Sequence, residues 1–299
     1  MVFGPKALSV KVSALIAFWG CENAAVFNLP HPLSWSCHLM AQELRVSRFA
    51  GFRIFVALLL LLPASSRPLA AEDGGVTSVP YPPAFIVVGF VGGFVRHTNV
   101  HHGPVRVAQR LQQDFPKDAH IEVFENRHRK MALRTILHLL DTNRDGVLSE
   151  QEKAAAHIML FGQSWGASAA VVLARDLKRI GVPVMLTVQV DSVRKLWQND
   201  EIIPENVAAA VNFYQPHGIL HGRSAIKAAD DSKTHILGNY RIDYKQSPIR
   251  CEGYSWFDRH ITPDHMQSAC DPHLWSQVEN LMLERRASEP QPVAANPAP

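Results

Sequence analysis

The chain has 299 residues, of which 30 are Lys or Arg, 27 are Asp or Glu and 15 are His, and its formal net charge is +3. The excess positive charge lies in residues 1–71, which hold six Lys or Arg against two Asp or Glu. The remainder has 24 basic and 25 acidic residues and is nearly neutral. The composition therefore gives no reason to expect a nucleic-acid partner.

Residues 40–71 have the pattern of a secretory signal peptide. Arginines come first, then an apolar run, a helix-breaking proline and small residues: Arg45, Arg48, Arg53, Ile54–Leu62, Pro63 and Ala70-Ala71. The apolar run is too short to cross a bilayer comfortably, although a retained membrane anchor is the alternative. We expect export to the periplasm or the cell exterior, with no stable membrane span after cleavage. Residues 1–39 are then an upstream extension or a mis-called start.

From residue 81 onward, strand-like and helix-like segments alternate. The expected strands are short apolar runs at 84–90, 120–126, 157–163, 182–191 and 207–215, and the expected helices lie at 105–115, 131–140 and 167–181. Such repeated units predict an α/β protein with a mostly parallel sheet and helices on both faces. We expect one domain over 75–285 and a disordered, Pro/Ala-rich tail over 286–299.

The sequence Gly162-Gln163-Ser164-Trp165-Gly166 lies between an expected strand and an expected helix. A tight turn in that position lifts a serine hydroxyl above the edge of the sheet, which is the arrangement of a nucleophile elbow. The alternative is an ordinary glycine-bearing turn with a surface serine.

With "FIVVGFVGG" (85–93) before it, "GQSWG" resembles the corresponding motif of the α/β-hydrolase superfamily, over roughly residues 82–280. The resemblance implies a catalytic triad in the order Ser, acid, His. It also implies an oxyanion hole made by the backbone amides of Trp165 and Phe90. The substrate class that it suggests is an ester or thioester, which the fold alone does not settle.

Asp191 is the expected triad acid because it ends the strand that follows the elbow helix, at the edge of the sheet where the serine lies. Asp230 and Asp231 are the alternatives. The base is expected near the C-terminus, where "DRHITPDHMQSACDPHLW" holds three histidines in a loop-like region. We favour His265, with His260 and His273 as alternatives.

Two cysteines, Cys251 and Cys270, lie in the part of the chain expected to be exported. A disulfide between them is expected and would stabilise the fold by about 3 kcal/mol. Two free buried thiols are the alternative. A second group of histidines, His97, His101 and His102, has no Cys or HExxH pattern beside it, so we interpret it as a pocket rim or surface loop rather than a zinc site.

Residues 141–152, "DTNRDGVLSEQE", match the EF-hand calcium loop at every ligand position. The expected Ca²⁺ ligands are Asp141, Asn143, Asp145, Val147 through its carbonyl, Ser149 through a water, and Glu152, with Gly146 at the sharp turn. No second loop is found, so we expect a structural ion that stabilises the region before the elbow. The alternative is a polar turn that matches by chance.

These features predict an exported serine hydrolase for a small or lipid-like ester, stabilised by calcium. The first rival is a non-catalytic calcium-binding protein on a hydrolase scaffold. The second keeps the fold but transfers the acyl group to an acceptor other than water. The sequence does not indicate the oligomeric state.

Overall fold

The computed structural model describes residues 83–115, 119–195, 198–254, 260 and 262–288. The predicted upstream extension and signal peptide lie outside these ranges, as does the tail from residue 289. All of the described residues belong to one compact unit. Within the described residues, no helix is both long and apolar enough to cross a membrane.

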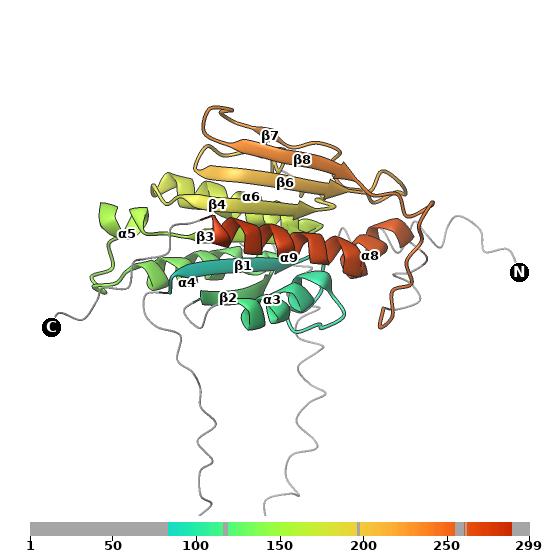
Figure 1. The fold of residues 1–299 in the computed structure, drawn as a ribbon, viewed down its shortest axis with the longest axis horizontal. Coiled ribbons are helices and arrows are strands. Elements are labelled where there is room, and N and C mark those ends of the chain that lie inside the picture. The colour runs from blue at the N-terminus through green and yellow to red at the C-terminus, as the bar shows by residue number, and fades with distance from the viewer. Residues whose placement is uncertain (1–82, 116–118, 196–197, 255–259, 261, 289–299) are drawn as a thin grey trace, which may run out of the picture. The chain divides into compact units, whose positions relative to one another are not determined.

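The main sheet has six strands in the order β2-β1-β3-β4-β6-β8, and every neighbouring pair is parallel (Figure 1). The strands are β1 (Phe85–Val91), β2 (Ala119–Glu125), β3 (Ile158–Gln163), β4 (Val184–Val190), β6 (Val207–Tyr214) and β8 (His235–Arg241). All residues of β1, β3 and β4 are buried, which explains why these segments are mostly apolar. Their polar residues, Gln163, Thr187 and Gln189, are buried as well. The predicted fold class is confirmed in this sheet.

One face of the sheet is covered by α4 (Arg129–Leu140) and α6 (Trp165–Arg179). Their buried residues, including Ile136 and Leu173, pack with Val88 and Leu160 of the sheet in one apolar core. The opposite face is covered by α3 (Gly103–Asp114) and α9 (Pro272–Ala287), which lie toward the viewer in Figure 1. Trp275 and other α9 residues pack there in a second apolar core.

Several elements were not predicted from the sequence. They are the edge strand β8, the helices α8 (Pro263–Cys270) and α9, the short helix η2 (Asn126–His128), and a two-stranded sheet of β5 (Ile202–Ile203) and β7 (Lys227–Ala228). The helix expected after the calcium loop is present as the short α5 (Glu150–Ala154). Helix α9 also continues two residues into the segment predicted to be a tail. Arg285 and Arg286 in its last turn interact favourably with the negative end of the helix dipole.

The strand order determines where a site can form. β1 lies between β2 and β3, so the chain leaves β1 in one direction along the sheet and later continues in the other. Ligand sites of parallel sheets lie at the carboxyl ends of the strands near such a switch point. In Figure 1 the arrows of the strands point to the edge at which α8 lies.

Candidate active site

Ser164 lies between the end of β3 and the start of α6, in a backbone conformation that few residues adopt, with φ 57° and ψ −127°. The two glycines that flank it allow the strand and the helix to cross closely. A Cβ added at Gly162 would lie 2.5 Å from the Gly166 carbonyl carbon, and one added at Gly166 would lie 2.3 Å from the Phe90 oxygen. The geometry is the strained strand–turn–helix that the motif predicts.

Three polar side chains from distant parts of the sequence meet at this turn. His265 Nε2 lies 2.8 Å from Ser164 Oγ, and His265 Nδ1 lies 2.6 Å from Asp191 Oδ2. All three residues are buried, with exposed fractions of 5% for Ser164, 4% for His265 and 0% for Asp191. The hydroxyl, imidazole and carboxylate therefore form one continuous hydrogen-bonded chain, which is the geometry of a Ser-His-Asp triad.

Asp191 directly follows β4 and has a φ of 44°. Its carboxylate accepts hydrogen bonds from the Gly222 amide at 2.6 Å, the Gln215 amide at 3.3 Å and the Gln215 side chain at 3.0 Å. These bonds compensate the burial of the charge and orient the free edge of the carboxylate toward His265. The sequence analysis missed Gln215, although its position directly after β6 could have indicated it.

The alternative triad residues do not meet at the turn. Asp230 accepts hydrogen bonds from the backbone and hydroxyl of Ser232, in the turn before β8. Asp231, His260 and His273 are exposed. None of these four side chains is hydrogen-bonded to Ser164, Asp191 or His265 in the described part of the chain.

His265 lies near the start of α8, so the loop predicted around it is wrong for residues 263–270. Proline at the start of this segment is compatible with a helical first turn, which the sequence analysis did not use. Gln163 Nε2 lies 3.4 Å from His265 Nε2 and 3.4 Å from Ser268 Oγ, and Ser268 Oγ donates to the His265 carbonyl at 2.7 Å. This buried amide was also missed.

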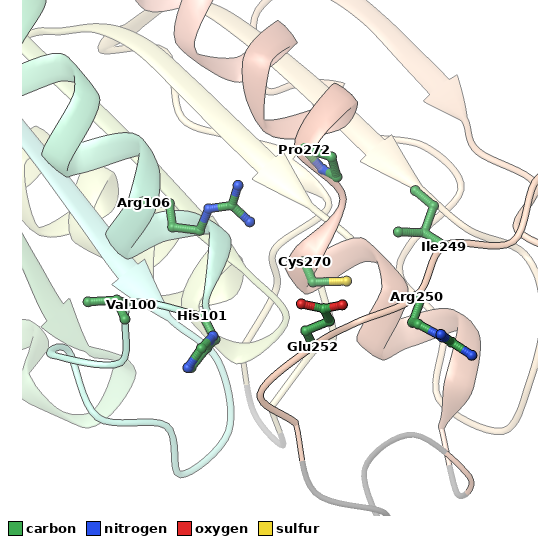
Figure 2. Close-up of a pocket in the computed structure, with 8 residues that line it drawn as sticks. All are labelled: Val100, His101, Arg106, Ile249, Arg250, Glu252, Cys270 and Pro272. Atoms are coloured by element: carbon green, nitrogen blue, oxygen red, sulfur yellow. The ribbon is translucent and has the colours of Figure 1, made fainter.

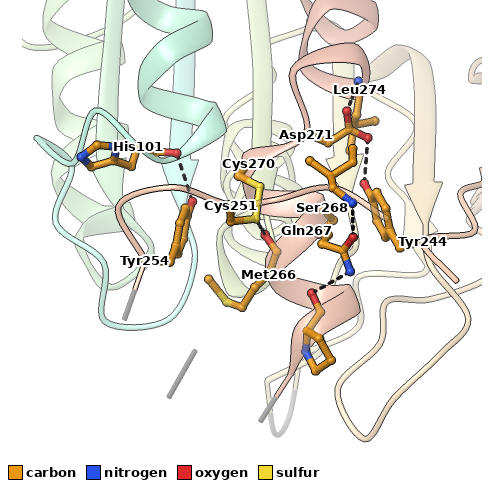
Figure 3. The surroundings of a disulfide bond; sticks show 12 residues. His101, Tyr244, Cys251, Tyr254, Met266, Gln267, Ser268, Cys270, Asp271 and Leu274 are labelled. Atoms are coloured by element: carbon orange, nitrogen blue, oxygen red, sulfur yellow. Dashed lines mark hydrogen bonds between the residues drawn. A yellow bond between two sulfur atoms is a disulfide. The ribbon is translucent and has the colours of Figure 1, made fainter. Parts of the chain in front are cut away.

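A disulfide joins Cys251 to Cys270 at the end of α8, with a Cα–Cα distance of 5.7 Å (Figure 3). The predicted bridge is therefore present. Beside it, Tyr244 Oη donates to Asp271 Oδ2 at 3.0 Å, and Asp271 in turn caps α9 by accepting from the His273 amide. The segment that carries His265 is thus attached at its C-terminal end by covalent and polar contacts.

The oxyanion hole differs from the prediction in one donor. The amide of Trp165 is the first of α6, and helix-starting amides have no partner within their own helix. Phe90, by contrast, lies inside β1 and is paired with Phe124 on one side and Gly162 on the other, so its backbone belongs to the sheet. The proposed Phe90 amide is therefore not available. Strand β1 simply extends one residue further than predicted.

The turn after β1 lies against the serine. A Cβ added at Gly92 would be 2.8 Å from Ser164 Cβ. The next residue, Gly93, has a φ of +48°, and the Gly92 carbonyl accepts from the Val95 amide at 3.2 Å. Amides of the Gly92-Gly93 turn therefore replace Phe90 as candidates for the second donor.

The three histidines after this turn have different environments. His97 is exposed and lies 3.6 Å from a Glu125 oxygen, and His101 is also exposed. His102 is buried, and its Nδ1 has no hydrogen-bond partner among the described atoms. Burial, and secondarily the nearby His265, lowers the pKa of His102 to about 4, so this ring is neutral at physiological pH.

A pocket of about 340 Å³ opens between α3, the segment 249–252 and the junction of α8 and α9 (Figure 2). Its lining residues are Val100, His101, Arg106, Ile249, Arg250, Glu252, Cys270 and Pro272. In Figure 2, Arg106 extends from α3 toward that junction, while Arg250 points away from it. Ser164 and His265 do not line this pocket, so it is distinct from the surface over the nucleophile.

The predicted calcium loop connects α4 to α5 and is partly arranged for a cation. Asp141 Oδ2 accepts from the Gly146 amide at 2.9 Å, and Gly146 has the positive φ of +82° required at the sharp turn. The carboxylate of Glu152, however, caps α5: it accepts from the backbone and hydroxyl of both Thr142 and Ser149. These bonds lower the pKa of Glu152 to about 2.

Across the described residues, no group of three or more His, Cys, Asp or Glu side chains is gathered as metal ligands would be. An EF-hand insertion is therefore not shown, and α5 is a single short helix rather than a full exiting helix. The oxygen donors Asp141, Asn143 and Asp145 and the turn at Gly146 fit a hard cation. Glu152 would have to exchange its hydrogen bonds for the ion.

The sequence matches no protein-family model and no curated protein. Similar solved structures include a thioesterase from the prodiginine biosynthetic pathway in Streptomyces coelicolor, with 13% identity, a TM-score of 0.35 and coverage of 72% of this chain and 96% of that one. A dienelactone hydrolase from Anabaena variabilis has 13% identity, a TM-score of 0.32 and coverage of 68% and 85%. A cutinase-like protein from Cryptococcus sp. has 10% identity, a TM-score of 0.34 and coverage of 67% and 94%. The strand order and the site geometry are properties of this chain and do not depend on these matches.

Proposed function

We propose that the protein is a serine hydrolase of carboxylic esters or thioesters. The observation that carries the proposal is the continuous hydrogen-bonded chain from Ser164 Oγ through His265 to Asp191, at 2.8 and 2.6 Å. A buried histidine between a strained serine and a fully hydrogen-bonded carboxylate has little structural purpose, because an apolar side chain would fill the same space without the cost of desolvating polar groups.

In this proposal, Ser164 Oγ attacks the carbonyl carbon of the substrate while His265 Nε2 takes the hydroxyl proton. Asp191 holds the imidazole in the required tautomer and stabilises its positive charge. The amides of Trp165 and of the Gly92-Gly93 turn donate to the oxyanion, where one such donor contributes about 3 kcal/mol. His265 then protonates the leaving alcohol or thiol, and a water molecule releases the acyl group from Ser164 by the reverse sequence.

We also propose that the protein binds a calcium ion and is exported. The turn at Gly146 and the oxygen donors Asp141, Asn143 and Asp145 support a Ca²⁺ site, with the Val147 carbonyl, a water at Ser149 and Glu152 as the remaining ligands. Such an ion would join α4 to α5, just before β3, and would supply charge stabilisation rather than chemistry. The disulfide supports an oxidising compartment, as the predicted signal peptide requires.

The test is labelling of purified residues 72–299 with a fluorophosphonate probe, together with hydrolysis of a neutral nitrophenyl ester. We expect labelling of the wild type and of Ser232→Ala, an exposed-turn control, and none of Ser164→Ala. His265→Ala should slow labelling by orders of magnitude, because the hydroxyl loses its base. A folded wild type that is neither labelled nor active would instead favour the non-catalytic calcium-binding protein. Transfer of the acyl group from Ser164 to added alcohols in preference to water would indicate an acyltransferase.

A further inference from the structure

A lysine lies beside the proposed nucleophile without a role in the triad. Lys195 is four residues after Asp191, and its ammonium lies 5.2 Å from the centre of the Trp165 ring, the residue next to Ser164. The backbone around it is tied to the elbow, since the Val193 amide donates to the Ser164 carbonyl at 3.4 Å. The Trp165 ring also meets the Phe94 ring edge-on, with 5.7 Å between the ring centres.

The charge of Lys195 has no acidic partner. Among the residues that the structure describes, no Asp or Glu oxygen lies within 4.0 Å of its ammonium. Other described lysines, such as Lys178 and Lys227, form ion pairs with glutamates. The side chain is partly buried, and burial together with the nearby Arg129 lowers the pKa of Lys195. A partly desolvated ammonium that is not neutralised attracts an anion to its side.

Lys195 is also fixed in position. Its ammonium donates to Asn126 Oδ1, and Asn126 Nδ2 donates to the Gly93 carbonyl at 2.5 Å and the Val91 carbonyl at 3.3 Å. Asn126 is buried, so this amide joins the lysine to the turn that is the candidate for the second oxyanion donor. An ammonium has three N–H donors, and the hydrogen bond to Asn126 uses one of them.

We infer that Lys195 selects substrates that carry an anionic group, a carboxylate above all, joined to the reacting ester or thioester by a short apolar segment. The Trp165 and Phe94 rings provide the apolar wall along which that segment lies, and Phe94 is 74% exposed, so this wall is open to an arriving ligand. Binding neutralises the ammonium, which Asn126 joins to the turn proposed to hold the oxyanion. The inference deepens the proposed function and depends on it.

A purely structural role is the competing explanation, because Lys195 could serve only to hold Asn126 and the turn. The two roles differ in what they change. Loss of the turn lowers the rate with every ester, while loss of an anion site lowers the rate with anionic esters more than with neutral ones. The discriminating quantity is therefore the ratio of the two kcat/KM values, not either value alone.

The experiment uses matched pairs of substrates. For the acyl side, the pair is the 4-nitrophenyl ester of glutaric acid and that of its monomethyl ester. For the alcohol side, the pair is 4-carboxyphenyl acetate and its methyl ester. Each ratio of kcat/KM is measured for the wild type, Lys195→Met, Lys195→Arg and Lys233→Met. Lys233→Met is the control because it also removes one positive charge. Lys233 precedes β8, so it lies at the amino ends of the parallel strands and not at the carboxyl ends, where Ser164 lies.

We expect the ratio for one pair to fall about ten-fold in Lys195→Met, the value of one charge-assisted hydrogen bond. It should be largely kept in Lys195→Arg and unchanged in Lys233→Met, and the pair that responds identifies the side of the ester. An unchanged ratio for both pairs in Lys195→Met, with Ser164 still labelled, overturns the inference and leaves the proposed function standing. A wild type that neither reacts with the probe nor hydrolyses any of the four esters overturns both.

Discussion

Backbone strain is concentrated at the residues that we propose for chemistry. Of the described residues other than glycine, three have a positive φ: Arg144, Ser164 and Asp191. Such conformations cost of order 1–3 kcal/mol each and persist only where neighbouring groups over-determine them. Gly222 and Gln215 hold Asp191 by hydrogen bonds, and the glycines around Ser164 leave room for its turn. The strain fixes two polar groups at one point instead of leaving them in relaxed loops.

At the same scale, His102 makes the stability of the protein depend on pH. Its pKa of about 4 lies below its ordinary value of 6.5, because the buried ring disfavours the charged form. Between these values the unfolded chain binds a proton that the folded chain does not, so stability falls as the pH decreases from about 6.5 to about 4. We expect this residue alone to remove about 3 kcal/mol over that range.

The measurement is urea unfolding at pH 7 and pH 4 for the wild type, His102→Gln and His235→Gln. His235 is exposed and serves as the control. The free energy of unfolding should fall less steeply with acid in His102→Gln than in the other two proteins. An equal loss in all three would show that the buried ring does not control this pH dependence.

At the scale of elements, apolar patterning was enough for the centre of the sheet but not for its periphery. Each strand from β1 to β6 of the main sheet lies within two residues of its predicted bounds. The buried strands β1, β3, β4 and β6 are dominated by apolar residues, and β2 was recognised although it includes His120 and Glu122. β8 alternates exposed and half-buried residues and is not dominated by apolar residues. Helix α8 was missed because its sequence mixes polar and small residues. Its contacts are long-range: the disulfide at its end, packing against α3, and the hydrogen bond from Trp275 Nε1 of α9 to the Ser268 carbonyl.

The prediction at the scale of elements concerns calcium binding by the loop between α4 and α5. We expect Ca²⁺ at 10 mM to stabilise the protein by about 1 kcal/mol, as a site in the weak affinity class of extracellular modules would. Thermal unfolding with Ca²⁺, with Mg²⁺ and with chelator measures the effect. Asp145→Asn should abolish it. Glu150→Gln should retain it, because Glu150 pairs with Lys153 and is not at a ligand position. Equal stabilisation of both variants would refute the site.

At the scale of the whole molecule, the sheet brings together residues that the sequence separates by 101 and 74 positions. Ser164 and Asp191 were predictable because each follows a strand recognised from its apolar run, and strand ends share one edge. His265 could be chosen only by its place late in the chain. Phe90 was chosen as an oxyanion donor although the expected strand already ended on it, and the structure continues β1 to Val91 with Phe90 paired on both sides. Lys195 and Asn126 carry no motif and were invisible until the fold placed them beside the elbow.

The disulfide links this long-range geometry to stability. Cys251 and Cys270 are 19 residues apart and enclose the segment that carries His265, so their bridge restricts the unfolded chain and the position of the base. We expect the variant with both cysteines replaced by serine to unfold with a free energy lower by about 3 kcal/mol. Ester hydrolysis should also slow, because His265 must stay within hydrogen-bonding distance of Ser164. Denaturant unfolding and kcat measure the two effects. Dithiothreitol should reproduce both in the wild type and change neither in the double variant. A wild type unaffected by the reductant, despite complete reduction, would show that packing of α8 alone holds His265 in place.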